Sequence, residues 1–155
     1  MRLSKNRIAV VVMGFAALTA GAAHAGGTQS VSLNATVLNV CLFQTQTPSI
    51  TIANTGSSID PSLAGPATGS TTVSYKCTKG AAAALTSPPA TGSVSTGGAT
   101  PSTMSVGLVY GALAAGNGFG QAAQTFTVTA NITQANYQDS PAGTYTGTVT
   151  LTINN

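Results

Sequence analysis

The chain has 155 residues and a formal net charge of +3, with five Lys and Arg residues against two Asp and Glu. Arg2, Lys5 and Arg7 carry this excess, and beyond residue 25 Lys76 and Lys79 are balanced by two aspartates. That later part contains no His, Glu or Arg, whereas general acid–base catalysis and metal binding need clusters of such groups. The composition argues against an enzyme, a cofactor site and a metal site. The near-neutral balance also argues against nucleic acid as a partner.

Residues 1–25 have the pattern of a secretory signal peptide. Basic residues precede an apolar run over residues 8–19, and Ala23-His24-Ala25 is a small-x-small pattern that signal peptidase accepts. A membrane anchor is the alternative, but the apolar run is short for a hydrocarbon core of about 30 Å. We therefore predict cleavage after Ala25 and export of the remaining chain as one domain.

The exported part has an even pair of cysteines, Cys41 and Cys77. In an oxidising compartment such a pair predicts a structural disulfide. A metal site or a catalytic thiol would need further groups, and this part of the sequence has neither a histidine nor a C-x-x-C motif. The disulfide is expected to tie the first long strand to the third, and closing such a loop contributes about 3–4 kcal/mol in the chain-entropy model.

Apolar and polar residues alternate with period two along most of the exported part, which predicts β-strands rather than helices. The predicted strands cover residues 30–37, 49–53, 71–77, 104–110, 125–132 and 143–155. Prolines within residues 55–70 and 87–102 predict loops there, because proline is excluded from central strands. The pattern predicts an all-β fold, an antiparallel β-sandwich of immunoglobulin-like type.

Two of these predicted strands present apolar faces that need a partner. The apolar face of residues 30–37 consists of Val31, Leu33, Ala35 and Val37. That of the last predicted strand consists of Tyr145, Val149, Leu151 and Ile153. No charge protects the edge of the last strand, so it is a template for another strand. Alternation reports burial and not the chain that provides it, so residues 30–37 could pair within their own domain or be donated to another chain.

Several motifs resemble a known family, the spore coat protein U domain, which occurs in subunits of archaic chaperone–usher pili. The resemblance covers residues 30–155 and rests most on the final motif. The motifs are Val31-x-Leu33-x-Ala35-x-Val37-x3-Cys41, Tyr75-Lys-Cys77-Thr-Lys-Gly80, Met104 ahead of Leu108-x-Tyr110, and Pro141-Ala-Gly143-Thr-Tyr145-Thr-Gly147-Thr-Val149-Thr-Leu151-Thr-Ile153.

The resemblance implies an immunoglobulin-like fold that lacks one strand and is completed by β-strand addition. Residues 26–37 would be the donor-strand segment and residues 38–155 the pilin-like domain. The apolar face Val31, Leu33, Ala35 and Val37 would insert into the next subunit, and Tyr145, Val149, Leu151 and Ile153 would border the acceptor groove.

The resemblance also implies partners and a location. The partners would be copies of this chain or related pilins, a periplasmic chaperone and an outer-membrane usher. The product would be a pilus on the cell surface, reached through the periplasm. The alternative function is a secreted adhesin or carbohydrate-binding module, which the absence of Trp and the few other aromatic residues disfavour.

Overall fold

The computed structural model describes residues 28–44 and 47–155. The predicted signal peptide lies outside the described residues, as do the first two residues of the predicted donor segment. The chain divides into two units, Met1–Ala35 and Thr36–Asn155. Among the described residues, all strands and the helix belong to the second unit.

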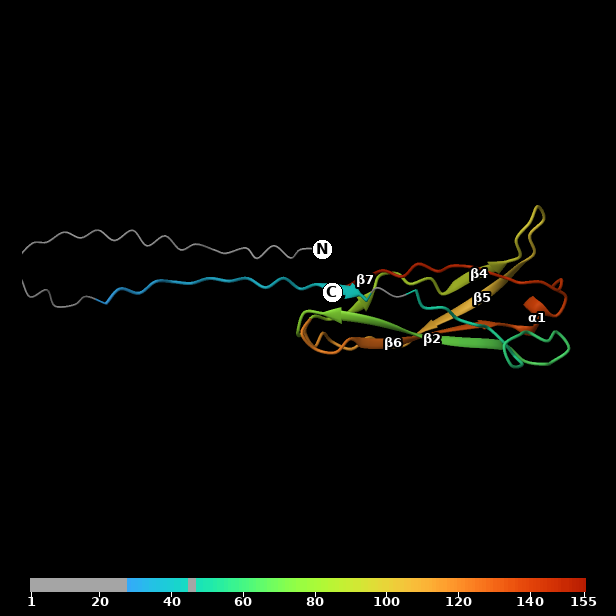
Figure 1. Ribbon diagram of the computed structural model, residues 1–155, viewed down its shortest axis with the longest axis horizontal. Helices are drawn as coiled ribbons and strands as arrows, with labels where there is room; N and C mark the ends of the chain where they lie inside the picture. The colour runs from blue at the N-terminus through green and yellow to red at the C-terminus, as the bar shows by residue number, and fades with distance from the viewer. Residues whose placement is uncertain (1–27, 45–46) are drawn as a thin grey trace, which may run out of the picture. The chain divides into compact units, whose positions relative to one another are not determined.

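The regular secondary structure of the second unit consists of antiparallel strands and one short helix (Figure 1). Its elements are β1 (Cys41–Phe43), β2 (Ala67–Cys77), β3 (Ala84–Leu85), β4 (Thr91–Ser95), β5 (Thr103–Tyr110), β6 (Gln124–Ile132), α1 (Gln134–Tyr137) and β7 (Ile153–Asn154). A five-stranded sheet has the order β1-β2-β6-β5-β4, and β3 pairs with β7 in a two-stranded sheet. The predicted all-β antiparallel class is confirmed.

The centre of the large sheet is the β2–β6 ladder, which extends from the pair Ala67–Ile132 to the pair Tyr75–Gln124. Alternation places Phe126, Val128, Ala130 and Ile132 of β6 in the core, whereas the intervening threonines lie on the outer face. Burial of each large aliphatic or aromatic side chain contributes about 1.5–3 kcal/mol. The core consists of one cluster around Tyr75, Cys77 and Phe126 and a second around Met104, Val106 and Ile132.

The predicted strands are only partly observed, because residues 30–37 and 49–53 form no strand and β2 starts within the predicted loop of residues 55–70. β5 and β6 match the predicted runs within one residue, whereas β2 begins at Ala67, ahead of the predicted start. The prediction of loop throughout residues 87–102 was wrong, because β4 lies there and pairs with β5. The prolines flank β4 and none interrupts its ladder, so the proline rule did not apply to the strand itself.

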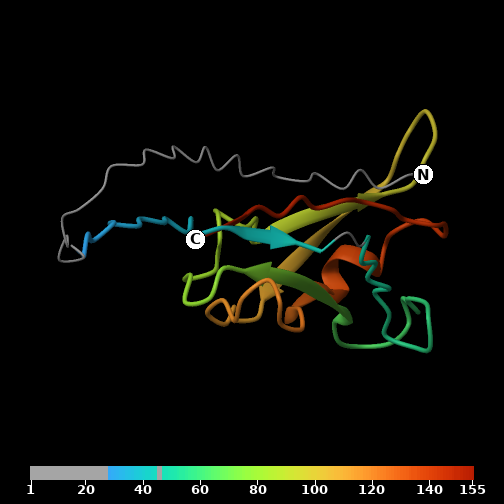
Figure 2. The same ribbon diagram turned by 60° about the vertical axis from the view of Figure 1, so that its left-hand side comes forward.

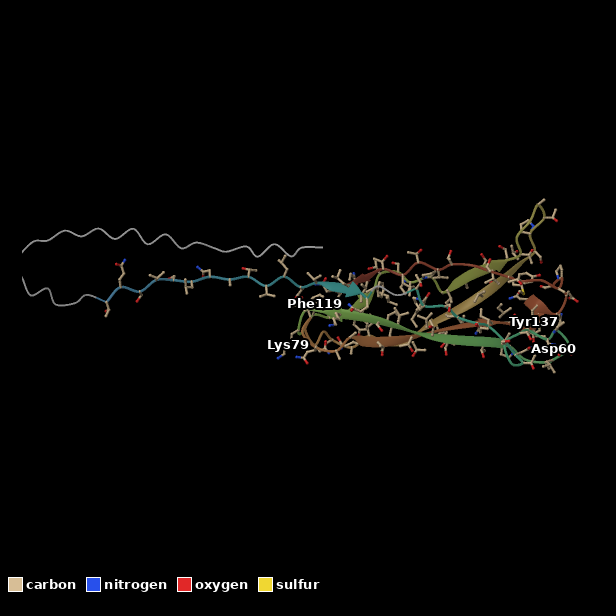
Figure 3. The ribbon with its side chains drawn as sticks, viewed as in Figure 1. Asp60, Lys79, Phe119 and Tyr137 are labelled. Atoms are coloured by element: carbon tan, nitrogen blue, oxygen red, sulfur yellow. A yellow bond between two sulfur atoms is a disulfide. The ribbon has the colours of Figure 1, made fainter. Side chains whose placement is uncertain are left out.

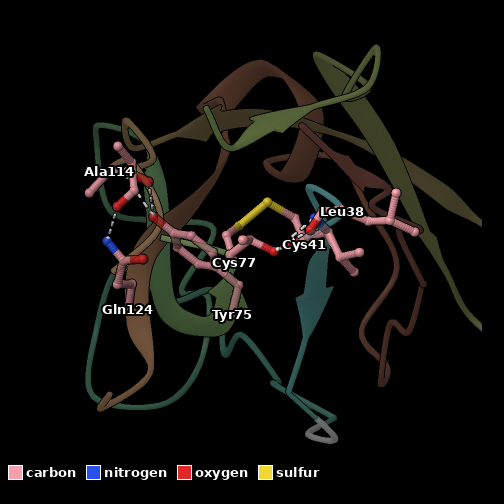
Figure 4. Close-up of a disulfide and its surroundings, with 9 residues drawn as sticks. Leu38, Cys41, Tyr75, Cys77, Ala114 and Gln124 are labelled. Atoms are coloured by element: carbon pink, nitrogen blue, oxygen red, sulfur yellow. Dashed lines mark hydrogen bonds between the residues drawn. A yellow bond between two sulfur atoms is a disulfide. The ribbon is translucent and has the colours of Figure 1, made fainter. Parts of the chain in front are cut away.

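A disulfide joins Cys41 and Cys77, as predicted, with Cα atoms 4.1 Å apart. The two residues are direct partners in the β1–β2 ladder (Figure 4). The expectation that the bond ties the first long predicted strand to the third was wrong, because residues 30–37 form no strand and Cys41 belongs to the short strand β1. The bond therefore fixes an edge strand to its neighbour.

We expect titration of the denatured, unreduced protein to find no free thiol. Replacing both cysteines by alanine is expected to lower the free energy of unfolding by about 2–4 kcal/mol, because the unfolded chain regains its loop entropy. Urea unfolding measures this loss in a chain kept monomeric by a copy of residues 28–37 joined to its carboxyl end. Two reactive thiols in the unreduced protein would contradict the pairing.

Candidate functional site

An apolar groove with a volume of about 1070 Å³ runs through the second unit. None of the residues that line it is charged. Its floor comes from β2, β5 and β6 and consists of Val73, Met104, Val106, Leu108, Val128, Ala130 and Ile132. Such a surface offers hydrophobic contacts, so it can hold an apolar segment.

Residues 47–52 form the first wall of the groove. Gly69 of β2 allows this segment to approach closely, because a Cβ atom there would collide with the carbonyl oxygen of Thr51 and crowd Ile50. The segment pairs with β2 only at its end, where Ala53 and Thr68 exchange two backbone hydrogen bonds of 3.1 and 2.9 Å. Among the described residues, no backbone hydrogen bond involves residues 47–52 themselves.

Residues 141–151 form the second wall. This segment lies alongside β4 (Figure 2), and Thr146 exchanges backbone hydrogen bonds of 2.8 and 2.9 Å with Ser95. Gly147 lies so close to Ser93 that a side chain at this position would collide with its backbone. Further along, the Thr86 amide donates to the Thr152 carbonyl over 2.8 Å. Within the described structure, residues 147–151 make no backbone hydrogen bond.

The final alternating run therefore differs from the long strand predicted over residues 143–155. Only Ile153–Asn154 are strand, as β7, and Thr146 forms an isolated bridge. A strand needs a ladder, and no described residue pairs with this segment over residues 147–151. Of the four residues predicted to border the acceptor groove, Tyr145, Val149 and Leu151 line this groove, whereas Ile153 is paired with Leu85 and lies outside the lining.

Tyr137 lines one end of the groove, and sequence reasoning had not identified it. Its side chain is only 3% exposed, and its hydroxyl lies 2.5 Å from the Gly65 carbonyl oxygen and accepts a 3.1 Å hydrogen bond from Asn54. The Asn54 side chain also accepts a hydrogen bond from the amide of Asp60, which is near Tyr137 in Figure 3. A lone tyrosine on a one-turn helix gives no periodic signal, so only the tertiary structure reveals this contact.

Tyr110 of β5 also lines the groove. Its hydroxyl donates to the carbonyl oxygen of Pro89 over 2.8 Å. Burial raises the pKa of Tyr110 above its ordinary value. Tyr110 and Tyr137 are thus structural tyrosines with satisfied hydroxyls. Tyr75, in the core, is of the same kind, because its hydroxyl bonds to both backbone groups of Ala114.

The predicted donor residues carry exposed apolar side chains. The exposed fractions are 79% for Val31, 90% for Leu33 and 81% for Val37, and Ala35 is also exposed. The structure contains no strand over residues 28–37. An alternating apolar face of this kind is normally buried, so its exposure marks a segment without a partner.

Among the described residues, no helix combines the length and the apolar character needed to cross a membrane. In the same part of the chain, His, Cys, Asp and Glu side chains form no group of three that could hold a metal ion. The chain matches no family model, no curated protein and no solved structure.

Proposed function

We propose that this protein is the structural subunit of a bacterial surface fibre, assembled by donation of a β-strand between copies. Residues 26–37 of one copy would insert into the groove of the next. The observation that carries this proposal concerns residues 47–52 and 147–151, which both line the apolar groove and make no backbone hydrogen bond to any described residue. An inserted strand would supply hydrogen-bond partners to both walls and pack its apolar side chains against a floor whose residues are already mostly buried.

The donor segment has the pattern that such a slot requires. Val31, Leu33, Ala35 and Val37 share one face of an extended strand, and the residues between them are polar. From Val31 to Val37 an extended chain spans about 20 Å. Full burial of a Val or Leu contributes about 1.5–3 kcal/mol, so the set supplies several kcal/mol. Each backbone hydrogen bond adds about 0.5–1.5 kcal/mol.

In this proposal the subunit is an immunoglobulin-like β-sandwich that lacks one strand. The inserted strand would join the two walls and complete the second sheet opposite β2, β6 and β5. Because the donor and the groove are different surfaces of one chain, each copy can donate to one neighbour and accept from another. Such a head-to-tail interface is heterologous and generates an open fibre.

The proposed assembly also needs helper proteins. An open apolar groove with unpaired edges promotes aggregation, so a periplasmic chaperone would cover it after export and an outer-membrane usher would exchange the chaperone for the next subunit. The resemblance to the spore coat protein U domain and the predicted signal peptide support this pathway. The absence of charge along the groove supports a protein partner over a charged ligand.

Electron microscopy of material sheared from cells tests the proposal. We expect thin fibres from cells that carry this gene together with its chaperone and usher, no fibres after deletion of the gene, and their return when the gene is restored. Antibodies against the domain should label the fibres along their length. Unchanged, unlabelled fibres in the deletion strain would contradict the proposal.

A further inference from the structure

Thr78 anchors the chain immediately ahead of β1. Its hydroxyl accepts a 3.1 Å hydrogen bond from the Val40 amide and donates a 3.0 Å hydrogen bond to the Leu38 carbonyl oxygen. Its own amide donates to the Val40 carbonyl oxygen over 2.9 Å. Figure 4 shows Leu38 and Cys41 beside the disulfide partner Cys77. One residue thus binds three backbone groups of a segment that directly follows the donor residues.

These contacts continue the β1–β2 ladder beyond its last pair. In that ladder Leu42 is opposite Lys76 and Cys41 is opposite Cys77, so Val40 opposite Thr78 is the next step. The carbonyl group of Leu38 also points to Thr78. Residues 38–40 therefore extend β1 toward its amino end and lie beside β2.

This anchoring bears on whether a subunit can fill its own groove. β1 and the bridge residue Ala53 both pair antiparallel with β2, with Cys41 opposite Cys77 and Ala53 opposite Thr68. The wall at residues 47–52 lies between them in the sequence. For residues 28–37 to pair with that wall in their own domain, the chain would have to reverse in a hairpin at residues 38–40. A hairpin there requires Leu38 and Val40 to release Thr78.

We infer that Thr78 is a positioning residue that prevents self-insertion of the donor strand and so directs it to another copy. This inference rests on the proposed function. The local sequence Asn39-Val40 is also unfavourable for a tight hairpin, because the favoured Asn-containing two-residue turn needs Gly at the second position. The hydroxyl of Thr78 and the side chain of Val40 together oppose the reversal.

The test combines two substitutions in the full chain. Thr78→Val removes the hydroxyl and keeps the volume, and Val40→Gly places a glycine directly after Asn39, which is the preferred sequence of a two-residue hairpin turn. Because Thr78→Val removes the two hydrogen bonds of the hydroxyl, we expect this change alone to raise the fraction of self-complemented monomer in size-exclusion chromatography about fivefold. With both changes it should rise about tenfold or more, at the expense of fibres. Thr78→Ser, which keeps the hydroxyl, should behave as the unmodified chain.

A third substitution shows how the monomer arises. Adding Leu33→Asp to the double variant should abolish the monomer, because a self-inserted strand needs Leu33 in the groove. Fibre formation by the double variant at the unmodified level would overturn the inference. So would a monomer that tolerates Leu33→Asp, or a Thr78→Val variant indistinguishable from the unmodified chain. These outcomes differ from a failure of the proposed function, in which the unmodified chain itself would form no fibres.

Discussion

Leu33→Asp is expected to abolish fibre assembly while the domain of residues 36–155 stays folded in its chaperone complex. Leu33 is at the centre of the donor's apolar face and is 90% exposed in the single chain. Assembly would carry an aspartate from water into a groove that contains no charged residue. Desolvating an unpaired carboxylate costs several kcal/mol, which exceeds the gain from burying one leucine. Electron microscopy of surface material tests the loss of fibres. Recovery of the subunit with its chaperone tests whether the domain stays folded.

Ser32→Asp is the matched control, because it introduces the same charge one residue away on the opposite face of an extended strand. We expect fibres with this variant, since its carboxylate stays in water. Normal fibres with Leu33→Asp would show that Leu33 is not buried in a neighbour. Loss of the folded Leu33→Asp subunit, even with chaperone, would show instead that Leu33 belongs to the subunit's own core.

A copy of residues 28–37 joined to the carboxyl end through a short flexible linker is expected to give a stable monomer. β7 precedes that end, so the added segment can turn back and lie antiparallel to residues 143–152. The linker makes insertion intramolecular, at an effective concentration of order mM. If this exceeds the dissociation constant about a hundredfold, the fold gains about 2.7 kcal/mol. Thermal unfolding and size-exclusion chromatography measure the gain.

The control for this design carries aspartate in place of the added copy's leucine, the one that corresponds to Leu33. It should resemble the unmodified chain, which we expect to aggregate or polymerise when purified without a chaperone. If the unmodified chain is already a monodisperse, heat-resistant monomer, and the added segment changes nothing, then its groove needs no further strand. That result would contradict the proposed incomplete fold.

Sequence alone predicted the parts of the fold in which burial and pairing coincide. β5 and β6 have regular alternation and paired neighbours on both sides, so their predicted bounds agree with the structure. The pairing of Cys41 with Cys77 followed from their number and compartment. Alternation predicted strands at residues 30–37, 49–53 and 143–155, but an alternating pattern does not specify which segment pairs with it. Most of these residues are in no strand, since no segment of the described chain pairs with them.

Only one of the two walls of the groove could be predicted from the sequence. The apolar face of the final segment is visible in the sequence, and Tyr145, Val149 and Leu151 do line the groove. The wall formed by residues 47–52 is not visible in the sequence. Its position depends on the close approach of Thr51 to Gly69, and this contact depends on the register of the strands. The role of Thr78 likewise depends on its place opposite Val40, which only the β1–β2 ladder reveals.

Hydrogen exchange of the monomer with the added donor copy tests the central claim most directly. In the single chain, residues 147–151 make no backbone hydrogen bond within the described structure, so their amides should exchange freely. If a donated strand fills the groove, the amides of residues 147–151 that face it should exchange much more slowly, together with alternate amides of the added copy. Exchange in both segments at the rate of an unstructured peptide would contradict strand donation into this groove.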